Sequence, residues 1–221
     1  MPYFTDYSHS CASTFTMIRK NSLFIKLLKL NISSFSLFNS FMDKFNPALE
    51  TCPVCGCCGN LHVHSYYYRY LIDFINNNPV THQIKIMRVS CDSCSTHAIL
   101  PDFIIPYSSY SLFFILRVLS EYFLKSHTVE KLCERFGIDT SQLYTWLNLF
   151  KAHKSQWLGA LEDAETSPKS FLNTVSESYS PFAMVFTRSF SYSFLQSHAN
   201  PPTAHYCQQI FSPDYDFMPT T

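Results

Sequence analysis

Two Cys-x-x-Cys pairs restrict the fold of this chain more than any other feature of its sequence. Cys52-Pro-Val-Cys55 is followed by Gly56, and Cys91-Asp-Ser-Cys94 stands further along the chain. Each pair places two thiolates on one side of a tight turn, and the glycine lets the main chain bend around a metal ion. Four sulfur ligands on two such turns are what Zn²⁺ prefers in a closed structural site. The spacing therefore predicts a structural Zn²⁺ site; two pairs of reduced thiols that bind no metal are the alternative.

The composition supports metal binding in a reducing compartment. The chain has 221 residues and nine cysteines, an odd number that gathers in Cys-x-x-Cys pairs, so metal ligation is favoured over a disulfide framework. We expect a cytoplasmic location. Charged residues make up only 14% of the chain and the formal net charge is zero, so any nucleic-acid partner must be argued from local motifs.

The segment between the two pairs is predicted to form a β-hairpin. Residues 61–72 are rich in aromatic and β-branched side chains and indicate one strand, and residues 83–89 indicate a second. The sequence Asn-Asn-Asn-Pro at 76–79 is a turn signal. A hairpin between two metal-binding turns is the zinc-ribbon arrangement, which we assign to residues 47–100. Such a hairpin is marginal alone, so metal binding and folding are expected to be coupled.

Five further side chains near the pairs are possible ligands. Cys57 and Cys58 could replace Cys55, but the geometry of the Cys-Pro-x-Cys-Gly turn favours Cys52 with Cys55. His62 and His64 share one strand face and are interpreted as surface or hairpin-packing residues. His97 follows the second pair and is interpreted as a loop residue without a role at the metal.

Residues 1–46 are interpreted as an N-terminal appendage that is partly helical. The stretch 17–30 is basic and apolar and predicts an amphipathic helix that packs on the chain or on a partner; a role at a membrane surface is the weaker alternative. Lysines interrupt its apolar run, and we expect no membrane span.

Residues 107–163 are predicted to be helical. An extended linker over 100–107 contains Pro101 and Pro106, and a helix is expected from about Ser109 to Lys125. The sequence from Val129 to Trp146 then fits a helix-turn-helix. In this interpretation the first helix buries Leu132, Cys133 and Phe136. Gly137 then makes the turn, and Ile138 fills the corner between the helices. Asp139 caps the second helix, with Gln142 reaching back to it, and Leu143 and Trp146 face inward. A plain helical hairpin is the alternative.

The second helix of this motif supplies the predicted DNA-facing residues. If it enters a major groove, its N-terminal and outward side chains contact DNA, with the two lysines at phosphates and Gln142 and Asn148 able to read adenine edges. These residues are Thr140, Ser141, Gln142, Tyr144, Thr145, Asn148, Lys151 and Lys154. A solvated polar face is the alternative, because the local basic charge is small.

The two motifs together resemble the front portion of insertion-sequence transposases. The zinc-ribbon pattern, the run Leu100–Leu112 and the helix-turn-helix pattern are also similar to an uncharacterised bacterial family thought to be transposase-related. The resemblance covers roughly residues 50–165 and implies that the four paired cysteines bind metal and that the helix at 140–151 faces DNA.

The rest of the chain carries no catalytic pattern that we can identify. Strand transfer needs three carboxylates that hold two metal ions on a separate domain, and the few acids after Lys154 lie on one short segment or in the tail. Residues 164–221 are interpreted as a low-complexity tail, partly helical or disordered. The sequence therefore predicts an α+β chain, a zinc-stabilised DNA-binding protein rather than an enzyme, acting as an accessory, regulator or remnant of a mobile element. A protein-interaction adaptor, with a protein partner or as a homodimer, and an enzyme subunit that needs another chain are the rivals.

Overall fold

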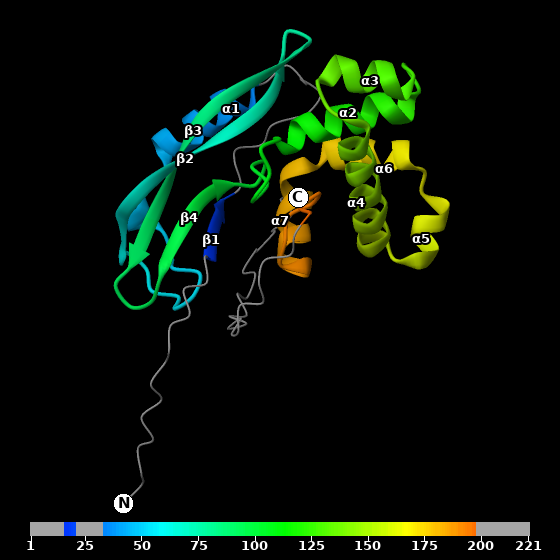
Figure 1. Cartoon of the computed structure of the whole chain (residues 1–221). Helices are drawn as coiled ribbons and strands as arrows, with labels where there is room; N and C mark the ends of the chain where they lie inside the picture. Colours follow the sequence, from blue (N-terminus) through cyan, green and yellow to red (C-terminus); the bar gives the residue numbers. More distant parts are fainter. Residues whose placement is uncertain (1–15, 21–32, 198–221) are drawn as a thin grey trace, which may run out of the picture.

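The computed structural model describes residues 16–20 and 33–197 and combines α-helices with a β-sheet. The sheet and α1 lie on one side of the molecule, and helices α2 to α7 lie on the other (Figure 1). The elements are, in chain order, β1 (Thr16–Lys20), α1 (Ser34–Lys44), a 3-10 turn η1 (Pro47–Leu49), β2 (Leu61–Ile75), β3 (Asn78–Cys91), β4 (Thr96–Pro101), α2 (Leu112–Leu124), α3 (Val129–Phe136), α4 (Thr140–Leu158), α5 (Ala160–Glu165), α6 (Pro168–Glu177) and α7 (Tyr179–Phe190).

The sheet is built on the predicted hairpin, which is longer than expected. Strands β2 and β3 pair antiparallel from Leu61↔Cys91 to Ile75↔Asn78. Asn76 and Asn77 make the turn with φ of 51° and 64°, the left-handed conformation that a two-residue hairpin turn requires and that asparagine tolerates. The strand order is β1-β4-β3-β2, with β4 antiparallel to β3 and β1 parallel to β4. Sequence reasoning missed β4 and placed the start of the linker at residue 100, inside this strand.

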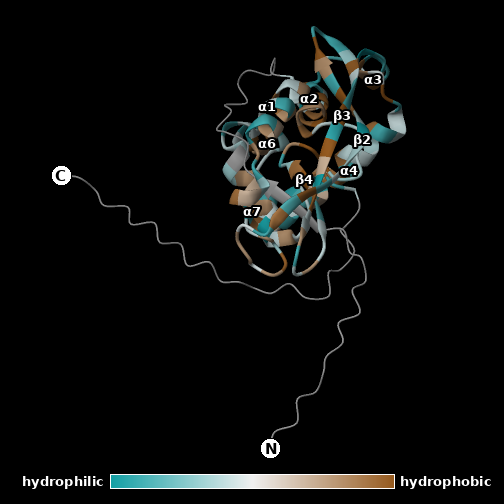
Figure 2. Cartoon of the chain, turned by 90° about the vertical axis from the view of Figure 1, so that its left-hand side faces the viewer, coloured by the Kyte–Doolittle hydropathy of each residue, from teal (hydrophilic) through white to brown (hydrophobic). Residues whose placement is uncertain are grey.

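The two faces of the hairpin differ sharply in burial. Leu71, Ile84 and Ile86 are buried on the face toward the helices, whereas Tyr68 and Lys85, which pair with each other on the opposite face, are exposed. Apolar and polar residues follow one another along the hairpin in Figure 2. The alternation is that of a sheet with one covered face and one face open to water.

Much of the segment interpreted as a low-complexity tail, partly helical or disordered, is helical and belongs to the main hydrophobic core, a packing role that the sequence analysis did not assign to it. Helices α6 and α7 and the turns after them bury Phe171, Phe182, Phe186 and Phe194 in the same cluster as the apolar face of α2. The rings of Phe182 and Phe194 meet edge to face, with centroids 5.0 Å apart. The apolar residues of this segment were visible in the sequence, but their partners lie far away in the chain. Residues 198–221, the end of the predicted tail, lie outside the described residues.

The N-terminal prediction also needs correction. A helix was expected over 17–30, but residues 16–20 form β1, because their main chain pairs with the edge of β4; residues 21–30 lie outside the described ranges. Helix α1 lies further on and is capped by Ser33, whose hydroxyl accepts a hydrogen bond from the Ser36 N–H. That hydroxyl also donates to Asp73 of β2 at 2.9 Å, which ties the start of α1 to the sheet.

None of the helices in the described ranges combines the length and the apolar character that a membrane crossing requires.

Candidate metal centre

The first cysteine pair sits in a turn that the local sequence builds. The Gly56 N–H donates to the Cys52 carbonyl oxygen at 3.0 Å, and Gly56 has a φ of 72°, which a residue with a side chain adopts at a cost. The Cys52 N–H donates in turn to the carbonyl oxygen of Cys57 at 2.9 Å. These bonds point the Cys52 and Cys55 sulfurs to the same side.

The second pair stands where β3 turns into β4. Cys91 is the last residue of β3, and its N–H donates to the Ser95 carbonyl oxygen at 3.2 Å. The Cys94 N–H donates to the Cys91 carbonyl oxygen at 3.4 Å, which closes a turn like that of the first pair. The long hairpin therefore brings its second end back beside Cys52, as the sequence predicted.

The four predicted ligand sulfurs come together. The Sγ atoms of Cys52 and Cys94 are 3.2 Å apart, those of Cys55 and Cys91 are 3.5 Å apart, and those of Cys55 and Cys94 are 3.9 Å apart. All four lie within 4.8 Å of one another, and all four thiols are free. A disulfide has sulfurs about 2.0 Å apart. The cluster could therefore hold a metal ion, which confirms the predicted convergence.

Hydrogen bonds and burial shift the pKa values of the thiols of Cys55, Cys91 and Cys94 in different directions. A hydrogen bond from the Cys57 main-chain N–H lowers the pKa of Cys55 to about 6, which favours the thiolate form. Burial raises the pKa of Cys94 and of Cys91 above the usual range of a thiol. A metal cation reverses this effect of burial, because the ligating form of cysteine is the thiolate and binding releases the protons.

An apolar layer supports the cluster from below. Leu61, Val89 and Ile99 are fully buried beside Cys52 and Cys91. Phe41 and Met42 of α1 pack against the same group and cover it. The sulfurs thus sit at the edge of a small core of their own, which keeps water from one side of the site.

His97 lies at the metal centre, contrary to the prediction that it is a loop residue. It belongs to β4, its side chain is fully buried, and its Nε2 is 3.4 Å from the Cys52 Sγ and 3.9 Å from the Cys94 Sγ. The missed signal is its position: Cys94-x-x-His97 places the ring on the strand that leaves the second turn. His62, in contrast, is exposed and lies 3.1 Å from an Asp92 carboxylate oxygen, as expected for a surface residue.

The remaining described cysteines are outside the cluster. Cys58 is exposed, and its Sγ is 3.1 Å from the hydroxyl oxygen of Thr51. Cys57 follows Cys55 without joining the four, so the preference for Cys55 is confirmed. Cys133 is buried among apolar residues of the main core, as predicted. Cys207 lies outside the described residues.

The second predicted functional region, α3 and α4, has the expected helix boundaries. Helix α3 ends at Gly137, with a φ of 60°, and α4 begins after Asp139. The Asp139 carboxylate accepts hydrogen bonds from the Ser141 hydroxyl and the Gln142 N–H, which together lower its pKa. Leu143 and Trp146 are buried as predicted, and the Trp146 ring lies 6.1 Å from Phe114 of α2.

The outward face of α4 retains most of the predicted DNA-facing residues. The exposed ones are Thr140, Ser141, Tyr144, Thr145, Asn148 and Lys151, and Gln142 is half-buried. Lys154 must be removed from the set. The residue is only 6% exposed, and its Nζ donates to the Asp163 carboxylate at 2.5 Å and to the Asp163 carbonyl oxygen at 3.0 Å. The chain folds α5 back beside the end of α4, which the helical spacing of α4 alone could not indicate.

The match with known families covers the middle of the chain. The profile of a domain of unknown function (DUF6431) matches residues 52–146, from the first metal-centre cysteine to the buried tryptophan of α4. No protein with a curated description matches the chain, and no solved structure does.

Proposed function

We propose that this chain is a zinc-stabilised DNA-binding protein in which the four-cysteine centre has a structural role and α4 contacts DNA. The observation that carries the proposal is that the chain combines a cluster of four free cysteines, which could hold a metal ion, with a two-helix unit whose second helix presents a polar face. The two parts are argued separately below.

Zinc is the metal that suits the donor set best. Four thiolates with Zn–S bonds of about 2.3 Å place their sulfurs about 3.8 Å apart in a tetrahedron. Three of the sulfur separations at this centre, 3.2, 3.5 and 3.9 Å, lie near that value, and all four sulfurs lie within 4.8 Å of one another. Cys52, Cys55, Cys91 and Cys94 would fill all four positions and leave none for water or substrate, which is typical of a structural site. The metal would join the two ends of the hairpin.

The α3–α4 unit supports DNA binding through its turn and its outward face. Two helices joined by a tight turn that contains glycine, with the second helix capped at its N-terminus, are the features of a helix-turn-helix. In this proposal Gln142 and Asn148 face base edges, and Lys151 contacts a phosphate. Because Lys154 is buried, the proposed surface has one lysine fewer than the sequence predicted. We therefore expect a weak affinity for DNA that falls as the salt concentration rises.

The order of the two modules supports a place among transposase-related proteins. A ribbon followed by a helix-turn-helix resembles the front portion of insertion-sequence transposases, and no carboxylate trio of a strand-transfer centre was found in the sequence. We therefore propose an accessory, regulator or remnant of a mobile element that binds DNA without cutting it.

A salt-dependent DNA titration tests the proposal. Fluorescence anisotropy of a labelled random-sequence duplex, measured between 50 and 300 mM NaCl, is expected to show binding that weakens steeply with salt. Lys151→Gln should weaken all duplexes alike and flatten the salt slope by about one, and the double variant Q142A/N148A should reduce discrimination between sequences by about 1–3 kcal/mol. The matched control is Lys169→Gln, which removes the same charge from the exposed surface of α6. DNA binding that Lys169→Gln and Lys151→Gln reduce equally would refute the assignment of α4.

A protein-interaction adaptor is the second candidate, and an exposed aromatic row favours it. Tyr66, Tyr68 and Tyr70 lie on the outward face of β2 and are 45%, 61% and 61% exposed. Tyrosine is enriched in protein interfaces because it presents a large apolar ring with a polar end. If Tyr68→Ser abolishes capture of a protein partner while Lys151→Gln leaves every activity unchanged, the adaptor is the better assignment.

A further inference from the structure

The sheet holds the imidazole of His97 beside the four-cysteine cluster. The main chain of His97 lies in β4 between two neighbouring strands, where it pairs with Val89 of β3 on one side and with Thr16 of β1 on the other. Its side chain is fully buried. A side chain carried by a strand is held more precisely than one on a loop, so the paired strands determine where the ring lies relative to the sulfurs.

The ring approaches one edge of the cluster without joining it. Its Nε2 lies 3.4 Å from the Cys52 Sγ and 3.9 Å from the Cys94 Sγ, two sulfurs that are themselves 3.2 Å apart. The set of side chains whose ligand atoms all lie within 4.8 Å of one another contains the four cysteines and not His97. A tetrahedral ion takes four ligands, which the cysteines supply. His97 therefore lies against the Cys52–Cys94 edge, outside the four ligand positions.

The charge of a metal-bound sulfur decides which atom of this contact carries the proton. Cysteine binds a metal as the thiolate, which has no proton to donate. An imidazole nitrogen without a proton would direct its lone pair at a negatively charged sulfur, and the two atoms would repel each other. With a proton on Nε2, the ring instead donates an N–H···S hydrogen bond at the same distance. With metal bound, the contact at 3.4 Å is attractive only when Nε2 is the donor.

The metal centre combines negative charge with apolar surroundings, which makes such a donor valuable. The negative charges of four thiolates exceed the positive charge of Zn²⁺ by two. Leu61, Val89 and Ile99 are buried beside the sulfurs, and their side chains donate no hydrogen bond. A buried charge is costly unless hydrogen bonds offset it. Cys52 is only 1% exposed, so His97 donates to a sulfur that water hardly reaches.

We propose that His97 is a positioning residue of the metal centre, which donates an N–H···S hydrogen bond from Nε2 to the Cys52 thiolate and thereby helps to retain the metal. A hydrogen bond to the charged form of a group stabilises that form, which here is the form that binds the metal. The same hydrogen bond makes the sulfur a weaker nucleophile. This inference rests on the proposed zinc site and adds a residue whose loss weakens metal binding without removing a ligand.

Competition for Zn²⁺ between the full chain and a chromophoric chelator tests the proposal. His97→Leu removes the donor, whereas the amide of His97→Gln can place an N–H near the position of Nε2. We expect His97→Leu to weaken zinc binding by about tenfold or more and His97→Gln to restore most of the loss. Should the leucine variant fail to fold, His97→Asn takes its place, because its amide is one methylene too short to reach the sulfur. The control is His62→Leu, which removes an exposed histidine outside the cluster and should leave the affinity unchanged.

Two further measurements distinguish a hydrogen bond from packing and from metal ligation. Iodoacetamide should alkylate the zinc-loaded His97→Leu chain faster than the parent, and His97→Gln should react as slowly as the parent. With saturating Co²⁺, the sulfur-to-metal charge-transfer band of His97→Leu should move to longer wavelength and keep the intensity of four thiolates, because its sulfur electrons are less stabilised.

Three results would overturn the proposal while leaving the zinc site intact. They are equal zinc affinities of the parent and His97→Leu, equal losses of affinity in the variants with and without a donor that reaches the sulfur, and a Co²⁺ spectrum of the parent with three thiolates and one nitrogen, which would make His97 a ligand. A parent chain that binds no zinc would refute the zinc site itself, and this proposal with it.

Discussion

Replacing Gly137 by valine is expected to destabilise the protein through strain at the turn between α3 and α4. The residue has a φ of 60° and a ψ of 38°, the left-handed conformation, which a β-branched side chain adopts only at high cost. Its N–H donates to the Glu134 carbonyl oxygen at 3.2 Å, and the next N–H, of Ile138, donates to the Cys133 carbonyl oxygen at 3.0 Å. Both bonds close the end of α3, so the conformation cannot relax without losing them.

The size of the effect follows from two contributions. Left-handed backbone costs a residue with a Cβ about 1–2 kcal/mol. A Cβ at this position would also lie 3.3 Å from the Pro79 Cγ at the tip of the hairpin, closer than an ordinary contact, and the γ-carbons of valine would add to the crowding. Valine also reduces the conformational entropy of the unfolded chain relative to glycine, which offsets about 0.4–1 kcal/mol of this destabilisation. The two quantified contributions leave about 0–1.6 kcal/mol, and the crowding against Pro79 adds to them, so we expect Gly137→Val to lower the free energy of unfolding by more than about 1 kcal/mol.

Urea denaturation followed by tryptophan fluorescence measures the difference, and two comparisons separate its causes. Gly137→Asn makes the same Cβ contact but tolerates a positive φ, and should cost less than about 1 kcal/mol. Pro79→Ala removes the contacting carbon, so Gly137→Val should cost less in that background by the contact contribution. A valine variant as stable as the parent, or an asparagine variant as damaged as the valine one, would refute the reasoning.

Two further predictions concern the metal centre and a buried histidine. We expect elemental analysis to find one Zn²⁺ per chain, and Cys91→Ser should lose this metal and unfold the 52–94 region. The control Cys133→Ser should keep the metal and lose only core stability. Full metal content in the Cys91 variant would contradict the ligand assignment. His153 is buried, its Nδ1 accepts the Leu195 N–H at 3.0 Å, and burial lowers its pKa to about 4 from 6.5. Between pH 6.5 and pH 4, His153 is therefore protonated in the unfolded chain but neutral in the folded chain. Above pH 6.5 the residue does not affect the free energy of unfolding. As the pH falls from 6.5 toward 4 that free energy declines, by about 1–2 kcal/mol at pH 5. His153→Asn should lack this part of the decline, and parallel pH profiles of stability for the variant and the parent would contradict it.

The features that could be predicted from the sequence are those set by neighbours in the chain. The two cysteine turns need only a Cys-x-x-Cys spacing, with a following glycine at the first of them, and the hairpin needs two β-rich runs with asparagines between them. The end of α3 at Gly137 and the start of α4 at Asp139 depend on backbone freedom and on a capping side chain within the same few residues. Such preferences act locally, so the sequence alone was sufficient for them.

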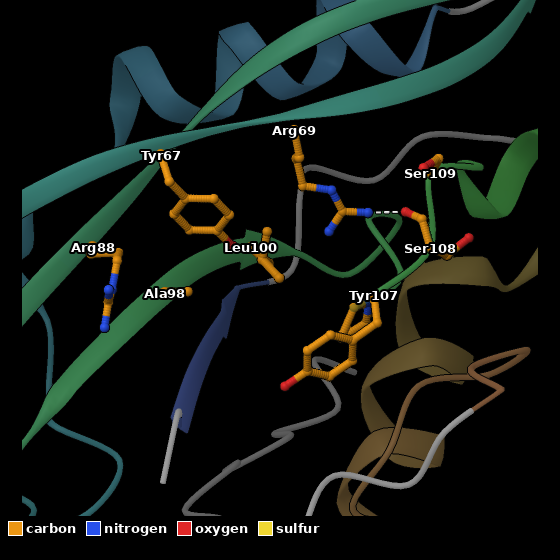
Figure 3. Close-up of a pocket in the computed structure, with 9 residues that line it drawn as sticks. Tyr67, Arg69, Arg88, Ala98, Leu100, Tyr107, Ser108 and Ser109 are labelled. Atoms are coloured by element: carbon orange, nitrogen blue, oxygen red, sulfur yellow. Dashed lines mark hydrogen bonds between the residues drawn. The ribbon is translucent and has the colours of Figure 1, made fainter. Parts of the chain in front are cut away.

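The features that only the tertiary structure decided depend on partners far away in the chain. His97 is three residues from a ligand, but its place beside the Cys52 sulfur follows from β4 pairing with β3. Lys154 fits the outward pattern of α4 until α5 returns and buries it against Asp163. A pocket of about 470 Å³ is lined by residues of β2, β3 and β4 and of the connection at 106–109 (Figure 3), which are brought together only by the packing of the connection on the sheet. Long-range pairing and packing select among conformations that local preferences leave equally favourable, and for that reason these residues could not be assigned from the sequence by itself.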